Sequence, residues 1–369
     1  MAGPGPGTCY IGAISSPLPA VTDLVCTVSG TLPAVISNLP SLTPTQPPPT
    51  ATPLITPIAS VTIPGAPGGL AVNLATNRIW VGESTGARVI AIDGATNAVI
   101  GQTVVGGAPG QIAINPTTNR VYVAVPDSSA VVEIDGQTQT LLATIPVPAK
   151  PIAIAINPAT NRLYVASYVF APGAAATISV IDGASRTVIA SITEPCCPSR
   201  LAVNPVTNRI YALKGIGFSV LVIDGVSNTV LSSFPSGNFP NDLAVDAALN
   251  RIYVVTAAGQ LGAYDAASQA QLTTGSIPFG ATSMVVNPTT HRLFVSGSGV
   301  AVSSDPAVSV IDADPLRVLG QVPIPGGIRG IAVNPVTSRI YVSGGDALFV
   351  IEDRAGEVIL DIERTVRIR

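Results

Sequence analysis

Residues 114–123 read INPTTNRVYV, and variants of this segment occur six more times along the chain. The other copies are VNLATNRIWV (72–81), INPATNRLYV (156–165), VNPVTNRIYA (203–212), VDAALNRIYV (245–254), VNPTTHRLFV (286–295) and VNPVTSRIYV (333–342). The arginine of each copy falls at position 78, 120, 162, 209, 251, 292 or 339, so the spacing stays between 41 and 47 residues. A period this regular predicts tandem structural repeats.

Each repeat contains four short apolar runs, which in the second copy are 110–115, 120–125, 130–135 and 140–146. We name these runs a, b, c and d. They alternate with period two and are too short for helices, so they predict β-strands. Asn-Pro with Thr-Asn predicts the a–b turn, and Asp-Gly, as in Asp135-Gly136, predicts the c–d turn. The sequence therefore predicts an all-β fold, a seven-bladed β-propeller of four-stranded antiparallel blades.

The repeat resembles the YVTN-family β-propeller repeats, which couple an Asn-Pro turn, a Tyr-Val strand and an Ile-Asp strand. The resemblance covers about residues 60–362 and all seven copies. The literal tetrapeptide does not occur, and the nearest forms are YVAS (164–167), YVVT (253–256) and YVSG (341–344). The resemblance implies a propeller fold and, less specifically, a surface, secreted or binding protein.

The composition excludes several classes of function. Of 369 residues 47% are hydrophobic but only 11% are charged, against about 25% in ordinary soluble domains. The net charge of −3 offers no basic surface for nucleic acid. No run of about 18 apolar residues is present, so membrane insertion is not expected. The first residues, MAGPGPGTCYIGAISS (1–16), show no ordinary signal peptide.

The repeat predicts where most of the charge lies. Strands b and c are antiparallel neighbours, so the arginine that begins b should lie beside the acid that ends c. We expect structural pairs of this kind rather than catalytic carboxylates, and exposed pairs contribute little individually. The pairs are Arg78–Asp93, Arg120–Asp135, Arg162–Asp182, Arg209–Asp224, Arg251–Asp265 and Arg292–Asp312, with Glu352 or Asp353 in the last copy.

Catalytic chemistry has no sequence support. His291, the single histidine, stands where the other copies have Asn or Ser, so we interpret it as a turn residue. No cluster of His and Cys, no C-x-x-C-H, no G-x-S-x-G and no Gly-rich strand-to-helix loop occurs. We therefore expect a protein that is not an enzyme and holds no metal and no cofactor.

Departures from the repeat concentrate in particular connections. The b–c connections are enlarged in the third copy, SYVFAPGAAAT (167–177), and in the sixth, SGSGVAVSSDPA (296–307). In a propeller the b–c and d–a connections share one face, so this face is the candidate interaction surface, although neutral loop drift would give the same pattern. The candidate interaction residues are Tyr168, Phe170, Pro172, Asp305 and Pro306.

The chain divides into three predicted regions. Residues 1–42 hold short apolar β-like segments that are too small to form a core alone. Residues 43–59 form a Pro/Thr-rich linker, and 60–369 form the propeller. Two segments compete for the outer strand of the last blade, ASVTIP (59–64) and GEVILDIERTVRIR (356–369). The surplus strand could add to a sheet edge or be donated to a neighbouring molecule.

Four cysteines lie in two groups, Cys9 and Cys26 near the N-terminus and Cys196 and Cys197 in the d–a connection between the third and fourth copies. They could be free thiols, or Cys9 could bond Cys26 within one chain. A Cys196–Cys197 bridge is possible but strained. The sharpest hypothesis joins the two N-terminal cysteines of one subunit to Cys196 and Cys197 of another.

Two functions are compatible with these features. The first is a structural or adhesive subunit of an extracellular, cell-surface or spore-surface assembly, possibly a filament, with other copies of the chain as partners. The second is a monomeric propeller that binds a ligand, a surface protein or a glycan through its central opening or its b–c loops.

Overall fold

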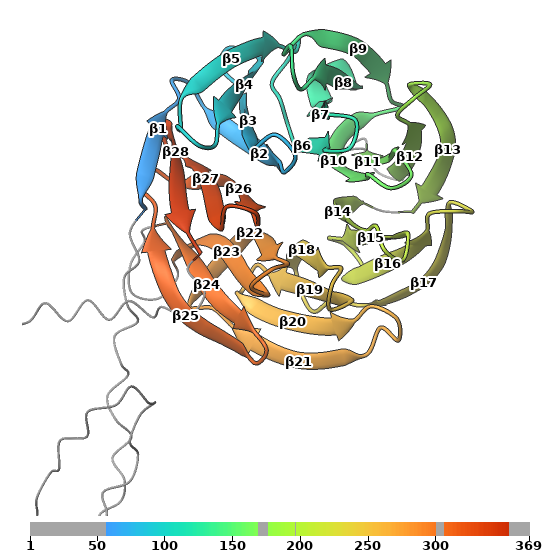
Figure 1. Ribbon diagram of the computed structural model, residues 1–369. Helices are drawn as coiled ribbons and strands as arrows, with labels where there is room; N and C mark the ends of the chain where they lie inside the picture. Colours follow the sequence, from blue (N-terminus) through green and yellow to red (C-terminus); the bar gives the residue numbers. More distant parts are fainter. Residues whose placement is uncertain (1–56, 169–175, 196, 300–305, 354–369) are drawn as a thin grey trace, which may run out of the picture. The chain divides into compact units, whose positions relative to one another are not determined.

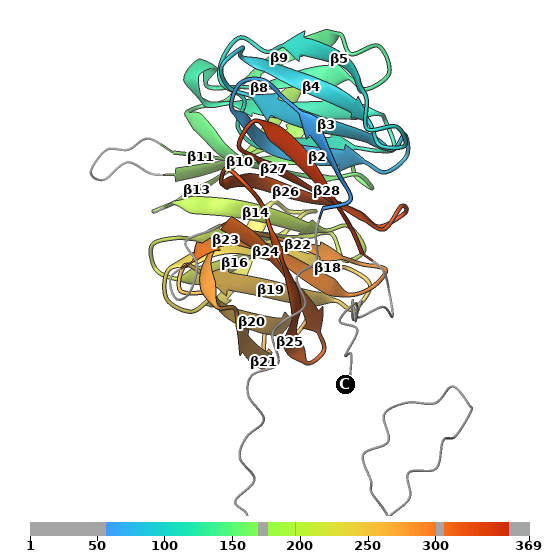
Figure 2. The same cartoon turned by 90° about the vertical axis from the view of Figure 1, so that its left-hand side faces the viewer.

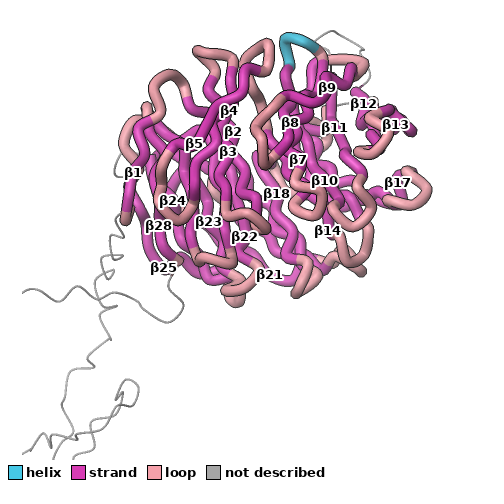
Figure 3. The backbone as a smooth tube through the Cα atoms, turned by 45° about the horizontal axis from the view of Figure 1, so that its top comes forward, coloured by secondary structure: helices cyan, strands magenta, loops and turns pink. Residues whose placement is uncertain are grey.

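The computed structural model describes residues 57–168, 176–195, 197–299 and 306–353, which form seven four-stranded antiparallel sheets around a common axis (Figure 1). This confirms the predicted seven-bladed β-propeller. The described residues are almost entirely strand and loop, and η1 (Pro126–Ser128) is a single turn of 3-10 helix between two strands of the second blade (Figure 3). The predicted region 1–42 lies outside the described residues, as does the linker up to residue 56.

Blades 1 to 6 each use four consecutive strands, which run in order from the axis to the rim (Figure 1). Blade 1 comprises β2 (Pro67–Asn73), β3 (Arg78–Glu83), β4 (Arg88–Asp93) and β5 (Val99–Val104). Blade 2 comprises β6 (Ile112–Asn115), β7 (Arg120–Val125), β8 (Ala130–Asp135) and β9 (Leu141–Pro146). Blade 3 comprises β10 (Lys150–Asn157), β11 (Arg162–Tyr168), β12 (Ala176–Asp182) and β13 (Thr187–Glu194).

The remaining blades repeat this order, apart from the outer strand of the last one. Blade 4 comprises β14 (Pro198–Asn204), β15 (Arg209–Lys214), β16 (Ser219–Asp224) and β17 (Thr229–Pro235). Blade 5 comprises β18 (Pro240–Asp246), β19 (Arg251–Thr256), β20 (Gln260–Asp265) and β21 (Gln271–Ser276). Blade 6 comprises β22 (Phe279–Asn287), β23 (Arg292–Gly299), β24 (Pro306–Ala313) and β25 (Leu316–Pro323). Blade 7 comprises β26 (Ile328–Asn334), β27 (Arg339–Gly344), β28 (Ala347–Glu352) and β1 (Ala59–Thr62).

The first strand of the chain closes the ring. β1 pairs antiparallel with β28, with Ala59 opposite Val350 and Thr62 opposite Ala347. Ile63 just beyond β1 is fully buried, and it packs with residues of blades 7 and 1. Of the two segments that could supply this strand, the one at 59–64 therefore does so. The competing segment, 356–369, lies outside the described residues.

The ends of the strands define two faces, seen edge-on in Figure 2. We call the end with the a–b and c–d turns the ring face. The opposite end, with the b–c and d–a connections, is the loop face; there Glu83 lies opposite both Pro67 and Arg88, and Arg88 lies opposite Val104. Cys197 and both enlarged connections belong to the loop face. Of the candidate interaction residues, Tyr168 ends β11 and Pro306 begins β24, whereas the other three (Phe170, Pro172 and Asp305) lie outside the described residues.

The hydrophobic core lies between the blades. In β7 consecutive side chains are buried on both faces of the sheet, because Val121 packs with Trp80 of blade 1 while Tyr122 packs with Leu163 of blade 3. Full burial of one large apolar side chain stabilises the fold by about 1.5–3 kcal/mol. An aromatic side chain, exposed by 1% or less, occupies the same place in every blade: Trp80, Tyr122, Tyr164, Tyr211, Tyr253, Phe294 and Tyr341.

Ring closure by β1 can be tested with two truncated chains, one starting at Pro57 and one at Gly65. The second also lacks β1 and the buried Ile63, and loss of one buried isoleucine alone costs about 2–5 kcal/mol. We expect a clearly lower urea midpoint for the chain that starts at Gly65. Equal midpoints would mean that another segment forms the outer strand of blade 7.

Candidate functional site

A buried polar side chain ends the a strand of every blade on the ring face. In blade 2 it is Asn115, whose Oδ1 accepts the N–H of Thr117 at 3.0 Å and so caps the a–b turn. The equivalent residues are also fully buried and cap their turns in the same way. They are Asn73, Asn157, Asn204, Asp246, Asn287 and Asn334.

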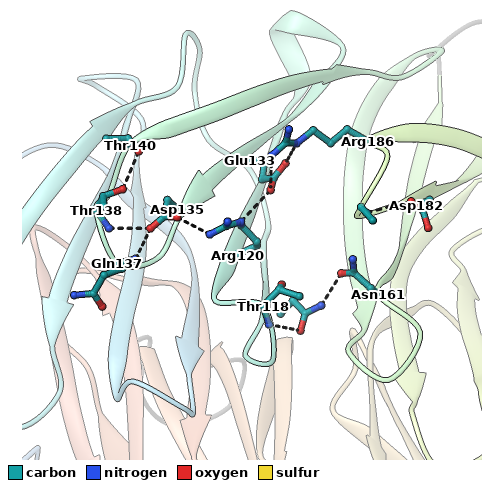
Figure 4. A network of polar contacts seen from close by, with 12 residues as sticks. Thr118, Arg120, Glu133, Asp135, Gln137, Thr138, Thr140, Asn161, Asp182 and Arg186 are labelled. Atoms are coloured by element: carbon teal, nitrogen blue, oxygen red, sulfur yellow. Dashed lines mark hydrogen bonds and ion pairs between the residues drawn. The ribbon is translucent and has the colours of Figure 1, made fainter.

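The amide of each of these asparagines then crosses to the next blade. Asn115 Nδ2 donates to Asn161 Oδ1 at 2.7 Å, and Figure 4 shows the dashed line that ends at Asn161. Five junctions follow this pattern, and the last of them joins blade 7 to blade 1. The other four are Asn73 to Asn119 at 2.8 Å, Asn157 to Asn208 at 2.7 Å, Asn204 to Asn250 at 3.0 Å and Asn334 to Asn77 at 2.7 Å.

The accepting asparagines all have a left-handed backbone. Their φ angles lie between 50° and 53°, a conformation that asparagine tolerates better than most residues. Two further junctions, described next, complete a closed circuit of seven side-chain hydrogen bonds. We call this circuit the asparagine ring.

The junction between blades 5 and 6 carries a matched pair of substitutions. Asp246 replaces the donating asparagine, and a carboxylate has no N–H to donate. His291 replaces the accepting asparagine, and its Nδ1 lies 2.6 Å from Asp246 Oδ2, where it can act as the donor. The interpretation of His291 as a turn residue agrees with its φ of 54° but is incomplete, because it missed this buried acid. The sequence contained one signal for this contact, because Asp246 in the fifth copy and His291 in the sixth each replace an asparagine of the repeat.

The junction between blades 6 and 7 is rebuilt with an acid from the end of β28. Ser338 stands at the accepting position and is shorter than asparagine. Asp353 Oδ2 instead accepts from Asn287 Nδ2 at 2.6 Å and from Thr290 Oγ1 at 2.5 Å. Arg292 Nη1 donates to Asp353 Oδ1 at 2.8 Å. The carboxylate is buried but has three side-chain donors, so its charge is satisfied.

The glycine after strand c has a different role from the one that the sequence suggested. In the c–d loop of blade 2 the positive φ belongs to Gln139 at 63°, so the loop is not a two-residue Asp-Gly turn. A Cβ at Gly136 would lie 2.1 Å from Asn119 Oδ1, so glycine leaves room for the ring asparagine. In blade 7 the ring residue is Ser338, and the equivalent position holds Asp353.

The repeat arginines and acids are directly opposed across strands b and c in all six predicted pairs, and Arg339 lies opposite Glu352. Side-chain ion pairs form between Arg120 and Asp135, at 2.5 Å, and between Arg209 and Asp224. The other five repeat arginines instead contact the next blade, at the end of a c strand or in a c–d turn. The contacts are Arg78 with Gly136 O, Arg162 with Gly225 O at 2.6 Å, Arg339 with Gly94 O at 2.5 Å, Arg251 with Asp314 at 3.0 Å and Arg292 with Asp353.

The acids at the ends of the c strands cap the c–d turns. Asp135 Oδ1 accepts the backbone N–H groups of Gln137 and Thr138, and the bond from Thr138 is the main cause that lowers its pKa. The same arrangement lowers the pKa of Asp93, Asp182 and Asp265. At Asp224 the N–H of Ser227, with further help from Val226 and Arg209, lowers the pKa to about 2.

A second polar link joins blades 2 and 3 in Figure 4. Glu133 is buried in strand c of blade 2, where Arg120 lies 3.3 Å away in the same blade. Arg186 approaches from the c–d turn of blade 3 at 2.5 Å. Because two guanidinium groups surround it, the buried carboxylate is paired on both sides rather than left uncompensated.

The innermost strands of blades 4 to 6 carry a polar cluster that the repeat does not explain. Asp242 Oδ2 accepts from Ser283 Oγ at 2.7 Å and from the N–H of Met284 at 2.8 Å, and Arg200 Nε lies 3.6 Å from Oδ1. Burial raises the pKa of Asp242, while the charge of Arg200 opposes that shift. The equivalent residues elsewhere are Gly69, Gln111, Ala153 and Gly330.

On the loop face, Cys197 lies directly before the first strand of blade 4. Cys197 is half-buried, has a φ of 31° and precedes Pro198, which lies opposite Lys214. Lys214 Nζ pairs with Glu194 at 3.2 Å across the junction of blades 3 and 4. Cys197 is disulfide-bonded, but Cys9, Cys26 and Cys196 lie outside the described residues, so the identity of its partner stays a prediction.

Within the described ranges, no three His, Cys, Asp or Glu side chains gather as a metal site would require. In the same part of the chain, no helix has the length and apolar character needed to span a bilayer.

Comparison with known proteins identifies the fold but no family. No family model matches the chain, and no curated protein matches it. Among solved structures the chain is similar to hydrazine synthase of Kuenenia stuttgartiensis, with a TM-score of 0.68 and 18% sequence identity. The match covers 81% of this chain and 98% of the other. At this identity the likeness shows the fold alone, and the resemblance to the YVTN family stays a prediction.

The asparagine ring predicts a rescue between paired substitutions. Asn115→Asp removes the donor that faces Asn161 Oδ1 and buries a carboxylate, which should lower the free energy of unfolding by about 1–3 kcal/mol. Adding Asn161→His recreates the pair seen at Asp246 and His291, so at least half of the loss should return. Adding Asn161→Ala instead should restore none of the lost free energy of unfolding. Urea unfolding of all variants measures this, and equal effects of His and Ala would contradict it.

The capping acids predict loss of stability in acid. Their pKa values are lowered in the folded protein, so the unfolded chain binds more protons and stability falls as pH drops from the ordinary aspartate range towards 2. Asp224→Asn keeps an oxygen that can cap the turn but removes the titration. We expect its urea midpoint to depend less steeply on pH below 5 than that of the unchanged protein. Parallel curves would contradict the role given to Asp224.

Proposed function

We propose that this protein is a structural or adhesive subunit of an extracellular, cell-surface or spore-surface assembly. In this proposal residues N-terminal to β1 dock on the propeller of a neighbouring copy, and repetition of the contact builds a filament. The main support is that β1 fills the outer position of blade 7 within the chain's own ring, so closure of the described propeller does not depend on the apolar segments that precede β1 in the sequence.

The direction of β1 supports contact between successive subunits. Ile58 N–H donates to Val350 O, and Ala59 lies opposite Val350 near the ring face, while Thr62 lies at the loop-face end of the pairing. The chain therefore enters the propeller from the ring face. Cys197 and the enlarged connections lie on the loop face, opposite the point of entry. A donor on one face and an acceptor on the other make a heterologous contact, and such contacts build open filaments when they do not close into rings.

The rim of the propeller also favours adhesion. The outer strands of blades 1 to 5 are sheet edges, and each has at least one exposed apolar side chain within its first three residues. Exposed apolar edges can pair with or adhere to other surfaces. These side chains are Val99, Ile100, Leu141, Leu142, Val188, Ile189, Val230, Leu231 and Leu272.

Disulfides would lock the docked segment in this proposal. Cys9 and Cys26 belong to the N-terminal segment, and the disulfide-bonded Cys197 lies on the loop face directly before β14. Pairing between subunits is compatible with an oxidising extracellular or surface location. Peptide mapping of the native material under non-reducing conditions would identify which of the four cysteines are joined.

A monomeric binding propeller is the second candidate. The observation in its favour is the cluster of Arg200, Asp242 and Ser283, in which unlike repeats bring together polar side chains on the innermost strands. A ligand, surface protein or glycan could be recognised there or at the b–c loops. Neither candidate requires catalysis, a metal or a cofactor, and we propose none.

Assembly is tested on the full chain by non-reducing electrophoresis and by negative-stain microscopy, with and without reductant. We expect polymers joined by reducible bonds, and Cys9→Ser with Cys26→Ser should remove the covalent ladder. A protein that stays monomeric under both conditions would contradict the assembly proposal and favour the monomeric binding function. Polymers that resist reductant would retain assembly but contradict disulfide locking.

A further inference from the structure

An exposed apolar cluster stands on the loop face of blade 4. Ile216 and Phe218 lie in the b–c turn, and Phe239 lies in the d–a connection that follows β17. Ile216 is 65% exposed and Phe239 is 67% exposed. Phe218 is half-buried, and its ring centroid lies 5.0 Å from that of Phe239 with the rings tilted at 57°, so the two side chains contact each other. We call these three residues the blade 4 patch.

The backbone of the patch is unusual for residues of this size. Phe218 has a φ of 45° and Phe239 a φ of 52°, a left-handed region that bulky side chains rarely occupy. Phe239 also precedes Pro240, which restricts it further. The left-handed residue of the b–c turn is small in other blades: Ala87, Ser129, Gly259 and Gly345.

Folding of blade 4 does not explain these aromatic residues. In blade 2 the positions of Ile216 and Phe218 hold Asp127 and Ser129, and that turn closes in the same place. Strained backbone at two phenylalanines, together with the exposed side chains of Ile216 and Phe239, indicates a role outside the propeller itself. The chain retains strain and exposed apolar surface at a position where small polar residues would suffice.

The blade 4 patch adjoins the d–a connection that contains Cys197. Pro198, directly after Cys197, lies opposite Lys214, and Ile216 follows Lys214 by two residues. The patch and Cys197 therefore belong to neighbouring connections on the loop face. A segment that reached one would pass close to the other.

The N-terminal segment has the chemistry to cover such a surface. Residues 1–56 contain one charged side chain, Asp23, and include the apolar stretches CYIGAI (9–14), DLVCTVSG (23–30) and LPAVISNL (32–39). The chain enters β1 from the ring face, so a copy stacked head-to-tail would bring its N-terminal segment to the loop face of its neighbour.

We propose that the blade 4 patch, Ile216 with Phe218 and Phe239, is the docking surface for the apolar N-terminal segment of a second copy of this chain. The inference rests on the proposed assembly and names the surface that accepts the segment. The strain at the two phenylalanines is then offset by contacts that form only in the assembly.

The test compares two triple variants of the full-length chain. Ile216→Asp, Phe218→Ser and Phe239→Ala install the residues found at the equivalent positions 127, 129 and 108. The matched control is Val99→Thr, Leu141→Thr and Leu231→Thr, which removes three exposed apolar side chains from the rim. The critical concentration for assembly is measured by sedimentation, and thermal unfolding checks that both variants fold.

We expect the patch variant to raise the critical concentration by about tenfold or more, equivalent to about 1.4 kcal/mol. The rim variant should stay within about twofold of the unchanged chain. If the unchanged chain assembles and the patch variant assembles equally well, the docking surface is wrong while the proposed function survives. If the unchanged chain does not assemble, both fail together.

A second measurement covers the case in which the patch variant does not fold. A photo-crosslinking residue replaces Tyr10 in the otherwise unchanged full chain, and the crosslinked peptides of the assembled material are identified by mass spectrometry. Crosslinks between chains to 214–219 or 235–240 are expected. Crosslinks confined to the rim strands or to the same chain would overturn the inference.

Discussion

The closed circuit of hydrogen bonds between blades is the constraint on which the rest of the propeller depends. Each blade is a sheet whose apolar faces can be buried only against its neighbours, so stability comes from the junctions. The asparagine ring sets the spacing of those junctions at the ring face, because each amide caps its own turn and also reaches the next blade. The repeat arginines add a second layer of contacts to neighbouring c–d turns.

The two altered junctions show how strictly this constraint acts. Asparagine can both donate and accept, whereas aspartate can only accept, so Asp246 is matched with a donor from His291. Where Ser338 leaves a space, Asp353 occupies it and gathers three donors. Asp246 and His291 depart from the repeat in neighbouring blades, whereas Ser338 and Asp353 depart from it within blade 7. In each case two residues change together, because a lone change would leave a buried polar group without a partner.

The ring face and the loop face therefore differ in how they depart from the repeat. The ring face repeats the same contacts in blade after blade, and its departures restore hydrogen bonds. On the loop face the departures do not restore a shared pattern. The strand ends that flank the enlarged connections, Cys197 and the blade 4 patch all lie at this face, where variation does not break the ring. A fold of this kind can therefore keep the contacts of one face constant while the other face acquires new contacts. In the proposed assembly the ring face maintains the hydrogen bonds between blades, and the loop face binds the neighbouring copy.

The sequence by itself determined the number of blades, the order of strands and the opposition of arginine and acid across strands b and c. These features depend on spacings of a few residues and on a side-chain period of two, so a linear pattern contains them. Only the tertiary structure decided that 59–62 closes blade 7, that Arg162 reaches Gly225, that Asp246 meets His291 and that Gly136 makes room for Asn119. Each of these depends on side chains from different parts of the chain, and the blade-to-blade contacts join residues 45 or more positions apart. Their meeting is set by how two twisted sheets pack, which the spacing within one repeat does not specify.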